Sequence, residues 1–214
     1  MERRDPYLFP QHWYFSEINE VSHMKTGGRF YTCGVSNGWP ILTFQTMQDG
    51  THVVGAGADK GAWLIDLTRT TTGGHSTSTQ VSVHDSPISS IRFFTPRGQQ
   101  SEMIVTGSWD KTIKYWDLRQ DKPVASLTCS DRIFALDVKH DVVVAATADG
   151  KVQIVDLNNP TSIFKTAPSA LKHQLRTVAV FPGAEGFAVA STEGRTGVQY
   201  LKDETKKYSL FTSF

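Results

Sequence analysis

The stretch IVTGSWDKTIKYWDL, residues 104–118, carries the pattern that decides the fold. It begins with a β-branched apolar run typical of a buried strand, passes through a polar turn at Asp110, and ends in an alternating segment. Because the side chains of a strand alternate between its two faces, Ile113 and Tyr115 are expected on the same face. The stretch therefore predicts two antiparallel strands joined by a tight turn.

The same pattern occurs in three further stretches of the chain. They are VVGAGADKGAWLIDL (53–67), VVAATADGKVQIVDL (143–157) and AVASTEGRTGVQYL (188–201). In each of the four stretches an acidic turn residue stands eight positions before the last leucine, and these acids are Asp59, Asp110, Asp149 and Glu193. The four leucines are separated by 51, 39 and 44 residues, close to the ~40–45 residues of a β-propeller blade.

The spacing of these units predicts an all-β fold, an incomplete β-propeller of four-stranded antiparallel blades. Helical periodicity is nearly absent, and glycine and proline stand mostly between the apolar runs. We assign residues 41–208 to propeller blades, leave residues 1–40 unassigned because they contain no such turn acid, and treat residues 209–214 as a divergent tail. The polar stretch 68–79 is expected to form a loop between blades.

The composition argues against several functional classes. Lys and Arg number 22 against 21 Asp and Glu, so a nucleic-acid binder that relies on a basic field over its whole surface is not expected. The two cysteines, Cys33 and Cys129, are too few for a disulfide framework and are expected to be reduced thiols. We find no secretory signal, no run of the ~20 apolar residues that a membrane span needs, and no metal-binding motif. A soluble intracellular protein without cofactor or metal is expected.

One of the four units contains a set of side chains that can form a buried polar network. His84 stands 22 residues before Thr106, and Asp110 and Trp116 follow. This spacing resembles the WD-repeat family, in which a His, a hydroxyl residue, a turn Asp and a strand Trp form a hydrogen-bonded chain inside one blade. The resemblance implies that role for His84, Thr106, Asp110 and Trp116. The other units lack the complete set, so a single network is expected.

The same residues also allow a catalytic interpretation, which we consider weaker. His84 and Asp110, with a nearby hydroxyl such as that of Ser86 or Ser108, have the residue types of a hydrolase triad. A hydrolase nucleophile needs a strained, exposed turn, and the chain has no Gly-x-Ser-x-Gly motif. We therefore predict that the protein is not an enzyme.

The informative cluster of charge lies near the C-terminus. Residues 165–207 contain seven Lys or Arg and four Asp or Glu, although the whole chain is nearly neutral. Arg176 and Arg195 stand at expected strand ends, with Lys172 four residues before Arg176. Guanidinium groups on a rigid sheet are suited to bidentate capture of a carboxylate or phosphate. The alternative is that these side chains are ordinary solvated charges at the edge of a propeller.

Several motifs in this half of the chain point to a more specific family. GSWDKTIKYWDLR (107–119), NNPTSIFKT (158–166), LKHQLR (171–176) and STEGR (191–195) resemble the nuclear-pore-associated mRNA export factors. The resemblance spans about residues 40–202. That family consists of seven-bladed WD-repeat propellers that bind a GLEBS-type nucleoporin peptide. A related WD-repeat protein of the spindle assembly checkpoint shares the LK-x-Q-x-R and S-x-EGR elements, and remains the alternative.

The resemblance implies a non-enzymatic scaffold in mRNA export, with residence in the nucleus, at the nuclear pore and in the cytoplasm. By that resemblance Arg176 and Arg195, and less directly Lys172, contact acidic residues of the bound peptide. Direct contact with RNA or a messenger ribonucleoprotein is left open, because the net charge does not support it. Seven blades need about 300 residues, so the four recognisable units are expected to form an incomplete ring.

Overall fold

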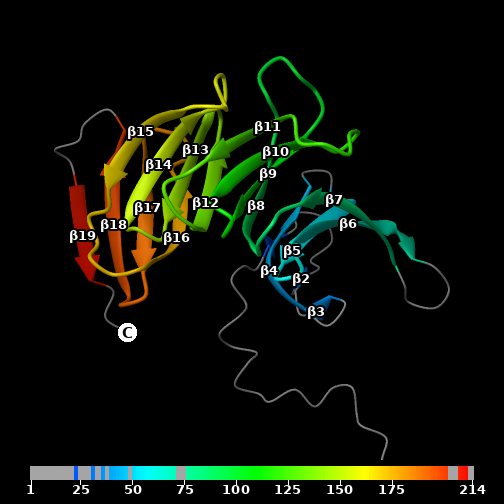
Figure 1. The fold of residues 1–214 in the computed structure, drawn as a ribbon, viewed down its shortest axis with the longest axis horizontal. Helices are drawn as coiled ribbons and strands as arrows, with labels where there is room; N and C mark the ends of the chain where they lie inside the picture. Colours follow the sequence, from blue (N-terminus) through cyan, green and yellow to red (C-terminus); the bar gives the residue numbers. More distant parts are fainter. Residues whose placement is uncertain are drawn as a thin grey trace, which may run out of the picture.

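The computed structural model describes residues 22–23, 30–31, 35–36, 39–47, 50–70, 76–201 and 207–211. Every regular element within these ranges is a β-strand, and none of these residues is helical. Four antiparallel sheets follow one another along the chain (Figure 1), and a short pair, β1 (Ser22–His23) with β2 (Phe30–Tyr31), forms a separate two-stranded sheet that contacts β4. The all-β prediction is confirmed.

Each large sheet is one blade and contains four consecutive strands, with a fifth in the first. Blade 1 comprises β3 (Val35–Ser36), β4 (Trp39–Thr46), β5 (His52–Gly57), β6 (Gly61–Thr70) and β7 (Ser76–Val83). Blade 2 comprises β8 (Ile88–Phe94), β9 (Met103–Ser108), β10 (Thr112–Asp117) and β11 (Ala125–Thr128). Blade 3 comprises β12 (Ile133–Lys139), β13 (Val142–Thr147), β14 (Lys151–Asp156) and β15 (Ile163–Pro168). Blade 4 comprises β16 (Leu175–Val180), β17 (Gly186–Ser191), β18 (Arg195–Tyr200) and β19 (Lys207–Phe211).

The blades are arranged side by side through their first strands. β4 contacts β8, β8 contacts β12, and β12 contacts β16, so these four strands form the inner edge of the assembly (Figure 1). The strands β7, β11, β15 and β19 are the opposite, outer edges of their sheets. Sequential four-stranded blades joined at their inner strands are the architecture of a β-propeller, here incomplete.

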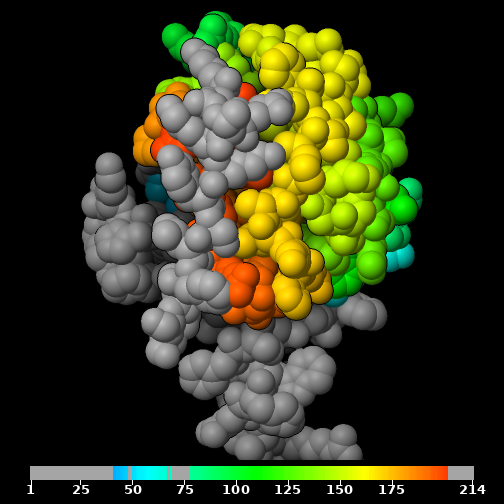
Figure 2. All heavy atoms as spheres, turned by 90° about the vertical axis from the view of Figure 1, so that its left-hand side faces the viewer, coloured from blue at the N-terminus to red at the C-terminus, as the bar shows by residue number. Residues whose placement is uncertain are grey.

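The apolar core consists of three clusters, one at each junction between neighbouring blades. Val54 and Ile91 belong to the cluster between blades 1 and 2, and Tyr115 and Leu136 to the one between blades 2 and 3. The cluster between blades 3 and 4 includes Phe187, which is 1% exposed. Figure 2 shows the third blade, in yellow, directly beside the orange part of the fourth. Each blade is thus stabilised mainly by burial against its neighbours.

The turns β5–β6, β9–β10, β13–β14 and β17–β18 have the same form in all four blades. Each turn acid is followed by a residue with positive φ. These residues are Lys60 (66°), Lys111 (71°), Gly150 (75°) and Gly194 (78°). The left-handed conformation reverses the chain within a tight hairpin, and glycine adopts it at no steric cost, whereas lysine does not.

The structure corrects three expectations drawn from the sequence. Most of the polar stretch 68–79 lies within β6 and β7, which pair as a hairpin inside blade 1, so it is not a loop between blades. Threonine and serine alternating on a half-exposed sheet are compatible with a strand, and this outweighed the polarity of the stretch. Residues 209–211 are likewise not a tail, because β19 runs to Phe211 and pairs with β18. The first blade begins before residue 41, since β4 starts at Trp39.

Candidate functional site

The predicted basic residues and turn acids lie at one end of the blades, which we call the turn rim. The turn rim consists of the turns 58–60, 109–111, 148–150 and 192–194, and the loops 84–87, 129–132 and 169–174. Backbone hydrogen bonds join loop to turn within a blade. The amide of Trp109 donates to the carbonyl of Pro87 at 3.0 Å, and the amide of Thr192 donates to that of Gln174 at 3.0 Å. These bonds make each part of the rim a rigid support for its side chains.

Arg176 and Arg195 are brought to the same end of blade 4. The register pairs Leu175 with Ser191 and Thr177 with Ala190, so Arg176 is the extra residue of a bulge at the start of β16. Arg195 opens β18 directly after the turn 192–194. In Figure 1 the β15–β16 loop and the β17–β18 turn meet at the lower end of the blade. Two residues 19 positions apart therefore share one rim because the hairpin returns the chain to its starting edge.

The turn acid Glu193 is bonded to two basic side chains. Its carboxylate lies 3.2 Å from Nε2 of His173 and 3.7 Å from Nε of Arg195. The Arg195 side chain is 37% exposed, and Arg176 and Lys172 are exposed as well. Glu193 thus orients Arg195 and does not cover it. His173 lies outside the set predicted from the sequence, although its place in the LKHQLR motif was the available signal.

The side chains in this part of the rim are of types that suit an anionic group. The guanidinium groups of Arg176 and Arg195 and the ammonium group of Lys172 lie at this end of the sheet. Glu193 is the turn acid beside them. Arginine donors in a planar fork match a carboxylate in two parallel hydrogen bonds, and an adjacent lysine adds a point charge. The arrangement suits an acidic peptide better than an apolar ligand.

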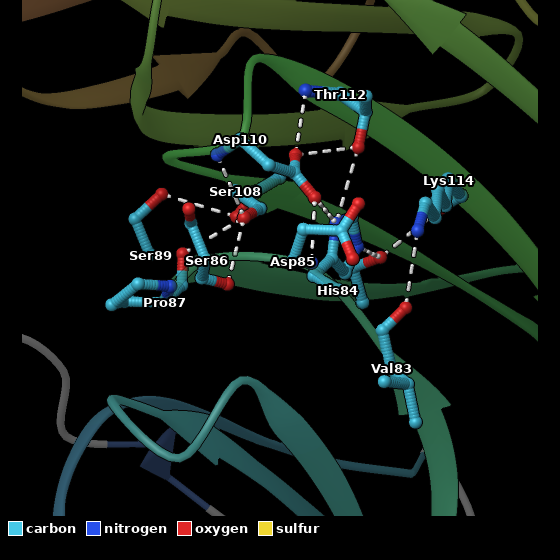
Figure 3. Close-up of polar contacts among 12 residues, drawn as sticks. Val83, His84, Asp85, Ser86, Pro87, Ser89, Ser108, Asp110, Thr112 and Lys114 are labelled. Carbon is cyan, nitrogen blue, oxygen red and sulfur yellow. Dashed lines mark hydrogen bonds and ion pairs between the residues drawn. The ribbon is translucent and has the colours of Figure 1, made fainter.

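The second group of predicted residues forms a hydrogen-bonded chain inside blade 2, of which Figure 3 labels His84 and Asp110. Nε1 of Trp116 lies 2.9 Å from Oγ1 of Thr106, which lies 2.8 Å from Nε2 of His84. On its other side, Nδ1 of His84 lies 2.8 Å from Oδ2 of Asp110. Thr112, which the sequence analysis did not include, adds a bond of 2.6 Å from its hydroxyl to Oδ1 of Asp110. The network links four segments of the blade that lie up to 32 residues apart in the sequence.

The direction of the hydrogen bonds follows from the donors at the two ends. The indole of Trp116 can only donate and the carboxylate of Asp110 can only accept. The Thr106 hydroxyl accepts from Trp116 and has two acceptors for its own proton, Nε2 of His84 at 2.8 Å and the carbonyl of Lys114 at 3.3 Å, while His84 donates from Nδ1 to Asp110. Burial lowers the pKa of His84 below its ordinary 6.5, although the hydrogen bond to Asp110 acts in the opposite direction. Burial thus favours the neutral imidazole, in which Nε2 accepts the Thr106 hydroxyl.

Asp110 stays ionised under the same conditions. Burial alone would raise its pKa, but hydrogen bonds from Thr112 and His84 outweigh burial and lower the pKa from 3.8 to about 2. The carboxylate also accepts the backbone amides of Thr112 and Asp85. A carboxylate that accepts this many hydrogen bonds stabilises the blade and stays ionised.

The geometry does not assemble a hydrolase triad. The hydroxyl of Ser108 donates to the carbonyls of Ser86 and Pro87, at 3.0 and 2.9 Å, and not to His84 (Figure 3). Both ring nitrogens of His84 are occupied by the network. A histidine in this state cannot take a proton from a serine nucleophile without losing a bond of the network.

The turn acids of the other blades have different partners. In blade 1, Asp59 accepts the indole N–H of Trp63 at 2.7 Å. In blade 3, Asp149 accepts the Thr147 hydroxyl and the Lys151 ammonium, both at 2.6 Å. The acid is therefore a common element of the turn, and its partner is specific to each blade.

The described residues contain neither a metal site nor a helix that could cross a membrane. No group of three or more His, Cys, Asp or Glu side chains with the geometry of a metal site occurs in the part of the chain that the structure describes. Within the same ranges, no helix is long and apolar enough to cross a membrane. Cys129 is a buried free thiol whose pKa is raised by burial to about 12, and Cys33 lies outside the described residues.

Known proteins are similar in sequence to this chain over most of its length. Residues 71–117, which hold the network from His84 to Trp116, match the model of the WD domain, G-beta repeat. The chain is 46% identical to the WD40 repeat protein poxJ of Penicillium oxalicum, with 81% of this chain and 48% of that protein covered. It is 41% identical to the mRNA export factor GLE2 of Chaetomium thermophilum, with 80% and 46% covered.

Two other relatives extend the comparison. The Poly(A)+ RNA export protein of Schizosaccharomyces pombe is 39% identical, with 92% of this chain and 54% of that protein covered. The Mitotic checkpoint protein bub-3 of Caenorhabditis elegans is 31% identical, with 78% and 46% covered. The chain spans about half the length of these relatives. The chain is a WD-repeat protein, and its homologues include proteins named as mRNA export factors.

Proposed function

We propose that the chain acts as a non-enzymatic scaffold in mRNA export and docks on an acidic nucleoporin peptide through the blade 4 part of its turn rim. Arg176, Arg195 and Lys172 are the residues that would contact the peptide. The names of the GLE2 and Poly(A)+ RNA export relatives support the export role. Residence at the nucleus and its pores would follow from that role.

The single observation that carries the docking proposal is the placement of Arg176 and Arg195 at one end of one blade. A bulge presents the first arginine, and a tight turn with a paired acid presents the second. Backbone geometry thus positions both arginines at this end of the blade before any ligand arrives, which would lower the entropic cost of binding. An extended acidic peptide could cross this rim with carboxylates opposite both groups.

A checkpoint role is the second candidate, supported by the identity to the Mitotic checkpoint protein bub-3. Both candidates use the same rim to read a peptide, so the arginines alone do not separate them. Relative affinity for a GLEBS-type nucleoporin peptide and for a peptide from a checkpoint protein would separate them. A clear preference for the nucleoporin peptide is the outcome that the export role requires.

The docking proposal is tested by charge reversal at the rim. Arg195→Glu is expected to weaken binding of an acidic GLEBS-type peptide by ~2–5 kcal/mol, since an attraction becomes a repulsion. Arg195→Lys should recover only part of the loss, because an ammonium cannot make the two parallel hydrogen bonds of a guanidinium. Isothermal titration calorimetry on the folded chain measures both effects.

The matched control is Arg97→Glu. Arg97 is 78% exposed and lies in the β8–β9 loop, at the end of the blades opposite the turn rim. This reversal changes the net charge equally and should leave peptide affinity almost unchanged. If Arg97→Glu and Arg195→Glu weaken binding equally, the effect is one of total charge and the assigned site is wrong. If neither weakens it, the rim arginines are solvated surface charges.

A further inference from the structure

The first strand of every blade carries a β-bulge at the turn rim. In each of these strands one residue has no partner in the register with the second strand. The four residues, which we call the bulge row, are Leu42, Ser89, Phe134 and Arg176. A bulge takes its extra side chain out of the alternation of the strand, and bulges are frequent beside binding sites. Arg176, which we assign to the peptide site, thus has an equivalent residue in each of the other blades.

The members of the bulge row lie next to one another from blade to blade. The hydroxyl of Ser89 in blade 2 donates at 2.6 Å to the carbonyl of Ile133, the residue directly before the bulge of blade 3. The strands β12 and β16, which carry Phe134 and Arg176, contact each other along the inner edge as β8 and β12 do (Figure 1). Phe134 is therefore the residue of blade 3 that follows Arg176 along the row.

The loop that leads into Phe134 carries an exposed arginine. Arg132 lies two residues before Phe134, whose ring is half-buried. The carbonyl of Arg132 accepts the amide of Ala148 at 2.8 Å, the same bond that Gln174 makes to the turn of blade 4. The guanidinium carbon of Arg132 lies 5.7 Å from the centre of the Phe134 ring. Because an aromatic face attracts a cation, this contact holds a charged group and an apolar group side by side on the rim.

The neighbouring cations of this part of the rim are already paired with acids. Lys111 lies 3.2 Å from Asp131, and Lys151 lies 2.6 Å from Asp149. Among the residues that the structure describes, no ion pair joins the guanidinium of Arg132 to an acid. Arg132 can therefore receive a carboxylate of a ligand without the loss of an existing ion pair.

The chemistry of Arg132 and Phe134 indicates which peptide residues they suit. The planar donors of a guanidinium match a carboxylate in two parallel hydrogen bonds. An apolar side chain placed on the Phe134 ring removes apolar surface from water, and it also shields the neighbouring ion pair from solvent. The pair thus suits a peptide in which an apolar residue stands close to an acid.

We propose that the acidic-peptide site of blade 4 continues onto blade 3, where Phe134 binds an apolar side chain of the peptide and Arg132 binds a further carboxylate beside it. The peptide follows the bulge row along the inner edge of the rim, from Arg176 to Phe134. This inference rests on the docking function proposed above. It adds a residue pattern that the peptide must have, with an apolar residue between two acids.

The test is isothermal titration calorimetry of the acidic GLEBS-type peptide on the full chain, repeated with a set of altered peptides. Each altered peptide has one Asp or Glu replaced by its amide, or one large apolar residue replaced by alanine. Arg132→Gln is expected to weaken binding of the unaltered peptide by about five- to tenfold. It should have no effect on one of the amide peptides, in which the partner of Arg132 is already lost. That acid should differ from the acid whose replacement cancels the effect of Arg195→Glu.

Phe134 is tested in the same way. Phe134→Ala is expected to weaken the unaltered peptide by about three- to tenfold, and the loss should vanish for one of the alanine peptides. Phe134→Leu should recover part of the affinity, because it restores apolar surface but not the ring that contacts Arg132. Thermal melts without peptide show whether each variant is folded. If Phe134→Ala does not fold, Phe134→Leu is titrated with the altered peptides in its place.

The matched control is Lys139→Gln. Lys139 is exposed and ends β12 at the opposite end of the blade from Arg132, so this variant loses the same charge in the same strand. Its affinity for every peptide should equal that of the parent chain.

The outcomes separate this inference from the docking function on which it rests. If Arg195→Glu weakens the peptide but Arg132→Gln and Phe134→Ala do not, the site ends at blade 4 and the extension is wrong. If Arg132→Gln weakens all the amide peptides by one factor, the arginine acts through its general field and the assigned contact is wrong. A peptide that does not bind the parent chain, or that binds Arg195→Glu equally well, overturns the docking function and the extension together.

Discussion

Arg92 of β8 and Asp137 of β12 form an ion pair that joins blades 2 and 3 at their inner strands, with 3.1 Å between Nε and Oδ1. The other carboxylate oxygen of Asp137 accepts the backbone amide of Val180 in blade 4 at 2.7 Å. One blade earlier, Oε1 of Gln45 accepts the amide of Phe93 at 2.7 Å. A polar side chain of each of β4, β8 and β12 thus bridges to the next blade, and Asp137 takes part in two junctions at once.

Asp137→Ala is expected to lower the free energy of unfolding by about 2–4 kcal/mol. The substitution leaves the Arg92 guanidinium, whose side chain is 17% exposed, without its carboxylate and removes the acceptor of the Val180 amide. Urea denaturation measures the change. Arg97→Ala is the control, since it breaks the pair with Asp141 at a side chain that is 78% exposed, and it should cost less than about 1 kcal/mol. Equal costs would show that the inner pair has no special part in joining the blades.

Trp116 should contribute more to stability than any exposed aromatic residue of blade 2. It is 3% exposed, and its N–H ends the network that begins at Asp110. Trp116→Ala is expected to cost ~3–5 kcal/mol, and Trp116→Phe, which keeps most of the ring volume but loses the N–H, about 1–3 kcal/mol. Trp109, at 36% exposure, provides the matched control, and Trp109→Ala should change the midpoint of urea unfolding little. An unchanged midpoint for Trp116→Ala would contradict the assignment.

Stability should fall as the pH decreases below about 6.5, because of His84. Its pKa is lower in the folded protein than in the unfolded chain, so the unfolded chain binds the proton first and is favoured as the pH decreases. The loss begins near the ordinary pKa of 6.5 and ends near the folded value. Urea denaturation between about pH 8 and 5 measures the slope, and His84→Gln should flatten it while lowering stability at every pH. A variant with the slope of the parent would rule out His84 as its source.

The lowered pKa of Asp110 predicts a second loss of stability at lower pH. Its pKa is about 2 in the folded protein against 3.8 ordinarily, so its contribution is complete above 3.8 and disappears as the pH decreases towards about 2. The shift corresponds to about 2 kcal/mol. Asp110→Asn should remove this part of the acid transition and also lower stability at neutral pH. Comparing the acid unfolding curves of parent and variant, with His84→Gln as the background, separates the two groups.

The turn of blade 1 contains a lysine in a conformation that glycine adopts more readily. Lys60 has φ of 66°, and Gly150 occupies the same place in blade 3 with φ of 75°. Lys60→Gly is expected to raise the free energy of unfolding by about 0.5–1 kcal/mol, and Gly150→Ala to lower it by about 1 kcal/mol. Thermal melts of both variants test the pair. A fall in stability for Lys60→Gly would mean that the lysine side chain contributes more than the backbone strain costs.

The repeat and its turns could be predicted from the sequence because their information is local. Within fifteen residues, the apolar run, the turn acid and the alternating segment of 104–118 specify two strands and the hairpin between them, and the structure confirms this all-β pattern. The spacing from His84 to Trp116 likewise depends only on positions inside one blade. The sequence did not predict that Thr112 belongs to this network, because many threonines occur in turns. Only the folded hairpin brings the Thr112 hydroxyl to the carboxylate of Asp110.

The contacts between blades were decided by the tertiary structure. Arg92 and Asp137 are 45 residues apart, and no periodicity along the chain distinguishes them from other charged residues on strands. The partner of each turn acid also differs, with Trp63 for Asp59 and His173 for Glu193. A strand pattern determines which face a side chain lies on, but its partner depends on the register and bulges of two sheets, which form only when the blades pack together.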